Sequence, residues 1–251
     1  MLSDIKLLTL ARLEKAAIDS GFDVVGGKVN NTLSFRSSQC PLKIWLGMQD
    51  ECPMVGLSKA DVVAELNRQA ISVPVDIDGC AGWVAAVDFV DLDQLLGRAY
   101  ALARALPNQL LESWSQQIQT ISTTEREAVV RQRIGQDLFR DGLMALWAGR
   151  CAITGIEEPG LLRASHAKPW KDATDAERLD VYNGLLLAAH LDAAFDQGLI
   201  TAGEDGVVIP SPTLASHTLS VLGLEGKLPT IALRVQHQPY LAWHRTYVFR
   251  G

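Results

Sequence analysis

The order of elements between residues 151 and 196 limits the fold of this chain more than any other feature. Residues 151–153 are a short apolar run closed by a Thr-Gly turn, and residues 161–166 are a second run that ends at His166. A charged loop follows, and the block 183–196 then reads NGLLLAAHLDAAFD. Short apolar runs bounded by turn residues indicate strands, and the end of the block has helical spacing. We therefore expect two strands, a loop and a helix that gather His, Asn and Asp side chains in one small unit.

The chain on either side of this unit predicts an α+β protein with two domains. For residues 1–110 we expect a compact α+β domain, a few strands with helices on one side. The expected helices are 3–19, 58–69 (with Ser58 as its cap) and 91–106, and the expected strands are 32–36, 43–48 and 83–90. Residues 111–122 are rich in Gln and Ser and are interpreted as a helical linker. Residues 123–251 form the second domain, which opens with a long helix that ends at Gly149.

The composition excludes several classes of protein. Of the 251 residues, 48% are hydrophobic and 21% are charged, which is typical of a folded chain. No apolar run reaches the ~18 to 20 residues of a membrane span, and Asp4 and Lys6 stand where a signal peptide would be apolar. We expect a cytoplasmic protein without membrane contact. The four cysteines form no CxxC pair, so we expect reduced thiols and no structural zinc.

Four separated blocks of the second half resemble the HNH endonucleases. They are 150–155 (RCAITG), 162–170 (LRASHAKPW), 183–200 (NGLLLAAHLDAAFDQGLI) and 240–249 (YLAWHRTYVF). The resemblance covers roughly residues 123–250, and it is specific because the blocks occur together and in the family's order. It implies a C-terminal HNH (ββα-metal) nuclease domain with flanking helices, and a metal-dependent activity on DNA.

The resemblance places the general base at His166. Phosphodiester hydrolysis needs a base that deprotonates water and a cation that stabilises charge on the phosphate. An imidazole with an ordinary pKa of about 6.5 is mostly neutral at cell pH and can accept that proton. The alternative is a strand-end histidine that caps a loop by hydrogen bonding. Asn183 would bridge backbone groups and fix the loop that holds His166, although an Asn-Gly turn needs no such role.

The metal ligands implied by the resemblance lie on the short helix of the third block. Asp192 stands nine residues after Asn183, where the family usually places a metal-binding side chain. Asp196 follows one helical turn later on the same face, but it could instead be structural. His190 could bind the metal or contact the scissile phosphate. We expect one divalent ion per active site, Mg²⁺ or Mn²⁺.

One position departs from the family pattern. Many HNH nucleases have Asp or His immediately before the base, whereas this chain has Ser165. A serine hydroxyl is a poor ligand for a hard dication, so water or another side chain would have to take that place.

The net charge of −6 requires any DNA-binding face to be a local patch. The best candidate is the arginine run of the long helix, which includes Arg126 and extends to Arg150; the alternative is a solvated helix face paired with neighbouring acids. The residues predicted to contact DNA are Arg131, Arg133, Arg140, Lys168, His244 and Arg245. For the last two, the alternative is a helix that packs on the nuclease core and leaves its charges in solvent. His217 and His237 show no partner pattern and are expected at the surface.

Three functions fit these observations. The leading hypothesis is a restriction-like or defence endonuclease in which the N-terminal domain selects DNA, possibly modified DNA. Because a double-strand break usually needs two active sites, this hypothesis includes a homodimer. The second is a catalytically decayed HNH scaffold that binds DNA or regulates, with Ser165 as the mark of lost catalysis. The third is a sensor domain that releases non-specific cutting when it binds a ligand.

Overall fold

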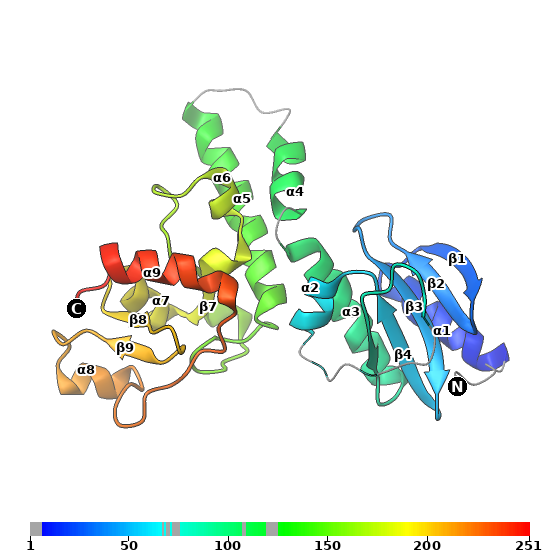
Figure 1. The fold of residues 1–251 in the computed structure, drawn as a ribbon. Helices are drawn as coiled ribbons and strands as arrows, with labels where there is room; N and C mark the ends of the chain where they lie inside the picture. Colours follow the sequence, from blue (N-terminus) through cyan, green and yellow to red (C-terminus); the bar gives the residue numbers. More distant parts are fainter. Residues whose placement is uncertain (1–6, 67, 69–70, 72–75, 107–108, 119–124) are drawn as a thin grey trace. The chain divides into compact units, whose positions relative to one another are not determined.

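The computed structural model describes residues 7–66, 68, 71, 76–106, 109–118 and 125–251. The chain divides into two compact units, Met1–Leu106 and Pro107–Gly251. Both units contain helices and strands (Figure 1), which confirms the expected α+β class. In the described part of the chain, no helix is both long enough and apolar enough to cross a membrane.

The first unit is built on a five-stranded antiparallel sheet in which consecutive strands are neighbours. The strands are β1 (Val24–Val29), β2 (Thr32–Arg36), β3 (Lys43–Gln49), β4 (Cys52–Leu57) and β5 (Gly82–Ala85). Asn30 and Asn31 form the tight turn between β1 and β2 with φ of 47° and 62°. Asparagine tolerates this left-handed conformation better than most residues, which is why an Asn-Asn pair suits a hairpin.

The described part of the first unit also contains three helices: α1 (Leu7–Asp19), α2 (Ala60–Glu65) and α3 (Phe89–Ala105). α1 and α2 both pack on α3. The buried side chains of α3 include Leu92, Leu96 and Ala99, which recur at helical spacing and form one apolar stripe. This stripe is what the sequence predicts for a helix that covers a core.

The central strands of the sheet are buried on both faces. Trp45 of β3 packs with Met54, Ile77 and Trp83 in one buried cluster. Gly56 pairs with Trp83 in the sheet register, and a Cβ at Gly56 would lie 2.9 Å from the Trp83 ring. The close approach of the indole therefore requires a glycine at this position.

Two expected elements of the first unit end earlier than predicted. The strand expected over 83–90 ends at Ala85, because Asp88 accepts a hydrogen bond from the Asp91 amide and starts α3. The helix expected over 58–69 spans only Ala60–Glu65. Ser58 does not cap it, because its hydroxyl accepts a hydrogen bond from the Lys43 amide at 2.9 Å. The first four residues of the helix expected over 3–19 lie outside the described residues.

The core of the second unit is the hairpin β6 (Leu162–His166) and β7 (Gly184–Ala188), followed by α7 (Ala189–Asp196). The strands are antiparallel, with Leu162 opposite Ala188 and His166 opposite Gly184. α7 follows β7 without a loop and packs back on β6. β6 and α7 match the strand expected at 161–166 and the helix expected within 183–196, whereas the strand that pairs with β6 is β7.

The remaining elements of the second unit surround this hairpin (Figure 1). They are α4 (Gln109–Ile118), α5 (Glu125–Leu146), α6 (Asp175–Arg178), β8 (Ile200–Ala202), β9 (Val208–Pro210), α8 (Ser216–Val221) and α9 (Gln238–Tyr247), with short 3-10 turns at Pro159–Leu161, Val181–Asn183 and Val235–His237. α4 falls in the range expected to be a linker, yet it packs on α5, where Trp114 Nε1 donates to the Arg131 carbonyl at 3.2 Å. Residues 119–122 of that range lie outside the described residues.

Residues 151–153 form a turn, so the strand expected there is wrong. The Gly155 amide donates to the Cys151 carbonyl at 2.9 Å and closes the turn. The Ala152 amide donates to the Leu186 carbonyl at 2.7 Å, and the Cys151 Sγ accepts from the Ala188 amide at 3.2 Å. These bonds tie the turn to β7 without extending the sheet.

The turn after α7 meets the last residues of the chain at Gly198. This glycine has φ of +68°, and a Cβ on it would lie 2.0 Å from the Val248 carbonyl oxygen. The Arg250 amide donates to the Gly198 carbonyl at 2.9 Å. Both the backbone conformation and the close approach require glycine here.

Candidate active site

His166 ends β6, and three neighbours fix its imidazole. Its Nε2 lies 2.9 Å from the Arg178 carbonyl oxygen. One face of the ring stacks on Phe139 of α5, with centroids 3.7 Å apart and planes at 13°. Trp170 meets the ring edge to face at 5.8 Å. The orientation of the imidazole is therefore set by a hydrogen bond and two aromatic contacts.

The hydrogen bond to Arg178 determines which nitrogen of His166 is free. A carbonyl oxygen only accepts, so Nε2 carries the hydrogen and the neutral ring has its lone pair on Nδ1. Among the described residues no side chain or backbone group makes a hydrogen bond with Nδ1. Burial lowers the pKa of His166 to about 4, and the Arg178 carbonyl opposes that shift. The ring is thus neutral near pH 7 with an unshared lone pair.

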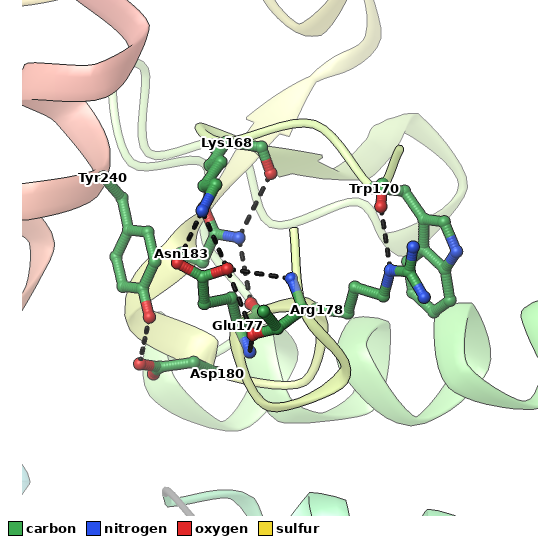
Figure 2. A network of polar contacts seen from close by, with 8 residues as sticks. Lys168, Trp170, Glu177, Arg178, Asp180, Asn183 and Tyr240 are labelled. Carbon is green, nitrogen blue, oxygen red and sulfur yellow. Dashed lines mark hydrogen bonds and ion pairs between the residues drawn. The ribbon is translucent and has the colours of Figure 1, made fainter. Parts of the chain in front are cut away.

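Asn183 joins the two ends of the loop between β6 and β7 (Figure 2). Its side chain is fully buried. The amide oxygen accepts from the Lys168 amide at 2.8 Å, and Nδ2 donates to the carbonyls of Lys168 at 3.2 Å and Glu177 at 2.9 Å. A buried amide with its donors and acceptor satisfied stabilises a single loop conformation.

An ion pair and a capping box organise the same loop (Figure 2). Lys168 Nζ donates to both carboxylate oxygens of Glu177, at 2.6 and 2.8 Å. Glu177 also accepts from the Thr174 amide at 2.8 Å, which completes a capping box at the start of α6. Arg178 Nε donates to the Trp170 carbonyl at 2.8 Å, and the guanidinium lies 5.1 Å from the Trp170 ring centre. Sequence reasoning missed Glu177 and Arg178, although the Thr-x-x-Glu spacing indicates a capping box.

Two carboxylates of α7 lie beside the hydroxyl of Ser165. Asp192 and Asp196 are one helical turn apart and share a face of α7. Ser165 Oγ donates to Asp196 Oδ1 at 3.4 Å, and a hydrogen bond with Ser165 also lowers the pKa of Asp192 against a larger opposing effect of burial. Burial raises the pKa of both acids, and the charge of Asp192 raises that of Asp196 further. A bound cation would relieve this repulsion.

A pocket of about 440 Å³ brings the imidazole and one of the acids together. It is lined by Gln136, Ala164, His166, Pro169, Trp170, Asp196, Gln197, His244 and Val248. His166 and Asp196 thus border the same cavity. Asp192 is not among its lining residues and adjoins it through Asp196. His190 does not line it either and is exposed in the first turn of α7.

Asp192 and Asp196 provide part of the ligand set that a hard divalent cation needs. The described residues contain no group of three or more His, Cys, Asp or Glu side chains that could hold a metal ion. Mg²⁺ in nucleotide enzymes is commonly held by one or two carboxylates, with water and substrate phosphates completing its shell. Asp192 and Asp196 supply such a pair, and Ser165 is a hydrogen-bond donor to it.

Two residues predicted to contact DNA are instead engaged inside the fold. His244 is 1% exposed, with Nδ1 3.0 Å from Thr201 Oγ1 and Nε2 3.1 Å from the Phe195 carbonyl. Because both ring nitrogens are bonded and buried, His244 cannot reach a phosphate. The Lys168 amine is likewise taken up by Glu177, with 19% of the lysine side chain exposed.

The other predicted DNA contacts differ in how far their side chains are buried or already hydrogen-bonded. They are Arg131, Arg133, Arg140 and Arg245. Arg140 donates to two backbone carbonyls at 2.7 and 2.9 Å. Arg245 donates to one at 2.8 Å. Arg131 is half-buried on α5, whereas Arg133 is exposed there. Arg133 is therefore the best placed of the four to meet a phosphate.

His237, expected at the surface, is 1% exposed. Its Nδ1 accepts from the Arg234 amide at 3.0 Å, and its ring lies 5.6 Å from that of Trp147 and 5.2 Å from that of Tyr182. Burial lowers its pKa to about 4. This histidine belongs to the core of the second unit.

Comparison with protein families decides the class of this unit. Residues 151–201 match the HNH endonuclease family model. The chain carries an HNH domain. The matched segment begins at the Cys151 turn, includes β6, β7 and α7, and ends in β8. It therefore contains His166, Asn183, Asp192 and Asp196. HNH domains are nuclease domains that generally use a divalent metal, and the family implies DNA as the substrate. No match to the chain was found among curated proteins.

Proposed function

We propose that the HNH unit hydrolyses phosphodiester bonds in DNA with His166 as the general base. The observation that carries this proposal is the state of its imidazole: Nε2 is bonded to the Arg178 carbonyl, and the lone pair of Nδ1 is unshared beside a pocket that Asp196 also borders. A general base needs a free lone pair within reach of the reacting water.

The work of the reaction would be divided between two sides of the pocket. Nδ1 of His166 would take a proton from the attacking water while Nε2–H stays bonded to Arg178. The low pKa of His166 makes protonation costly in the free protein. A bound phosphate would place negative charge near the ring and raise that pKa, so the base would become effective with substrate in place.

The other side of the pocket would hold the divalent ion. Asp192 and Asp196 are the proposed ligands, and the ion, Mg²⁺ or Mn²⁺, would stabilise charge on the phosphate and on the leaving oxygen. His190, exposed in the first turn of α7, would contact the scissile phosphate. Asn183 would act by fixing the loop that supplies the Arg178 carbonyl.

The proposed biological role is a restriction-like or defence nuclease in which the first unit selects DNA, possibly modified DNA. Arg133 would contact the backbone, with weaker contributions from Arg131, Arg140 and Arg245. We further propose that the enzyme acts as a homodimer, because two active sites cut two strands in one binding event. A monomeric mass in sedimentation, together with double-strand breaks made in one event, would contradict the dimer.

A second candidate is a DNA-binding protein on a decayed HNH scaffold. Ser165 in place of an acidic ligand, and the lack of a three-ligand cluster among the described residues, favour it. Against it stands the free Nδ1 of His166 in a ring that borders the same pocket as Asp196.

A digestion experiment separates these candidates. The full chain is incubated with plasmid and either Mg²⁺ or Mn²⁺, beside a His166→Ala variant. Discrete fragments from the wild type alone support a target-selecting endonuclease, and a smear supports a non-specific one. Binding without cleavage in either metal contradicts the nuclease and supports the scaffold. Plasmids that differ only in methylation then test dependence on base modification.

A further inference from the structure

We propose that Glu177 and Arg178 are positioning residues that hold His166 in the tautomer with its hydrogen on Nε2. The inference rests on the proposed role of His166 as the base. Neither of the two residues lines the pocket of the proposed reaction.

The acceptor that selects the tautomer is a backbone carbonyl, so its position depends on what anchors residue 178. The Arg178 side chain is fixed at two points, by Nε to the Trp170 carbonyl at 2.8 Å and by Nη1 to Asp175 at 2.7 Å. One residue earlier, the Glu177 carbonyl accepts from Asn183 Nδ2 at 2.9 Å. The peptide that faces His166 therefore cannot rotate without breaking several bonds.

Arg178 also acts on His166 through a second route. Its guanidinium lies over the Trp170 ring at 5.1 Å, and the same indole meets the imidazole edge to face. One residue thus holds the imidazole by its carbonyl and holds the ring that packs against it by its side chain. Movement of Arg178 would loosen both contacts together.

The ion pair between Glu177 and Lys168 holds the other end of the loop. Its side chains are 28% and 19% exposed, whereas the Arg150 and Glu157 pair of the same unit is 63% exposed at Glu157 and 61% at Arg150. Pairs in solvent contribute little because water screens them, so a shielded bidentate pair is the stronger restraint. The exposed pair provides a matched control of the same chemistry.

Loss of this restraint has a specific consequence for the base. If the Arg178 carbonyl moves away, nothing on the Nε2 side selects the tautomer, and a fraction of the imidazole carries its hydrogen on Nδ1. That form has no lone pair toward the pocket and cannot accept a proton from water there. The expected defect is a shift in tautomer with the protein still folded.

The test is nitrogen NMR of the full chain labelled with ¹⁵N-histidine, without DNA or added metal. The His166 signals are assigned by their absence in His166→Ala. We expect the Nε2–H form in the wild type, a mixture of tautomers in Glu177→Gln and Lys168→Met, recovery in Lys168→Arg, and no change in Glu157→Gln. Single-turnover cleavage should fall by roughly ten- to a hundredfold in the first two variants, because the imidazole loses its fixed position as well as its tautomer, with DNA affinity unchanged.

An unchanged His166 spectrum in folded Glu177→Gln and Lys168→Met would overturn the proposal, as would an equal change in Glu157→Gln. Lys168→Met leaves the capping box of α6 intact, so it decides the matter alone if Glu177→Gln fails to fold by circular dichroism. The tautomer is read without substrate, so this result tests positioning alone. Absence of cleavage by the wild type would instead contradict the proposed function.

Discussion

Two imidazoles border the same pocket in similar surroundings, and only one keeps a ring nitrogen without a hydrogen bond to the described residues. His166 stacks on Phe139 at 3.7 Å, and His244 stacks on Phe195 at 3.8 Å. Burial lowers the pKa of each to about 4. His244 uses both nitrogens in hydrogen bonds, whereas His166 uses one. Burial and a shifted pKa therefore do not distinguish the two rings; the unshared Nδ1 of His166 does.

The positions of the two residues in the fold explain the difference. His166 stands at the end of β6, where the strand gives way to a loop that approaches the ring from one side. His244 lies inside α9 and is bonded to β8 through Thr201 and to α7 through the Phe195 carbonyl. His244 thus joins three elements and stabilises their packing. Because both of its nitrogens are hydrogen-bonded, it has no free lone pair that could accept a proton.

Replacement of His166 should give the largest effect. His166→Ala should reduce single-turnover cleavage by about 10² to 10⁴-fold, the usual contribution of a general base, while DNA binding is retained. The rates are measured with excess enzyme, and binding by fluorescence anisotropy. If this variant cleaved DNA at the wild-type rate, His166 would not be the base and would not differ in function from His244.

Loss of an acid on α7 should weaken the metal side of the pocket. Asp192→Asn should lower Mn²⁺ affinity about tenfold or more, measured by calorimetry, since ligand changes cost at least as much as changes behind the ligands. The same variant should lower the pKa of Asp196, because the neighbouring charge that raises it is removed. Asp141→Asn, at an exposed acid of α5, is the control. Equal affinities in the two variants would place the ion elsewhere.

His244→Ala should reduce stability and leave the chemistry intact. Removing a buried ring that makes two hydrogen bonds and a stack should lower the free energy of unfolding by about 3 kcal/mol. Urea unfolding measures the loss, with exposed His217→Ala as control. The cleavage rate per folded molecule should stay near that of the wild type. A rate loss as large as that of His166→Ala would make His244 part of the reaction.

The smallest effect is a pH dependence of stability. His166, His237 and His244 have folded-state pKa values near 4, below the ordinary value of 6.5. The unfolded chain therefore takes up protons that the folded chain excludes, so stability is complete above about pH 6.5 and is lost as the pH falls toward 4. His244→Gln should reduce the slope of unfolding free energy against pH by one proton, about 1.4 kcal/mol per pH unit. Urea midpoints at pH 7, 6 and 5 that do not decline would contradict the buried, neutral state of these rings.

The parts of the HNH unit that the sequence predicts are those made by neighbouring residues. β6, β7 and α7 follow from local apolar patterns and turn residues, and the block 183–196 lies where the pattern places it. Residues 151–153 do not become a strand, because their hydrogen bonds go to a turn and to β7. Such bonds depend on chain segments more than thirty residues away, which a local pattern does not record.

The candidate site, too, is predicted by the sequence only in part. The grouping of His166, Asn183, Asp192 and Asp196 in one motif follows from the resemblance of the sequence blocks to the HNH endonucleases. The burial of His244 is not, because it arises when α9 packs against elements formed some fifty residues earlier. Nothing in the first unit carries a motif, and its sheet alone does not define a ligand.

Gly198 links the far end of the chain to the cavity wall. Even a methyl group there would collide with the Val248 carbonyl, and Val248 itself lines the pocket. A Gly198→Ala change would therefore displace Val248 and reshape the cavity. The dimensions of this pocket thus depend on the absence of a side chain at position 198, which does not itself line it.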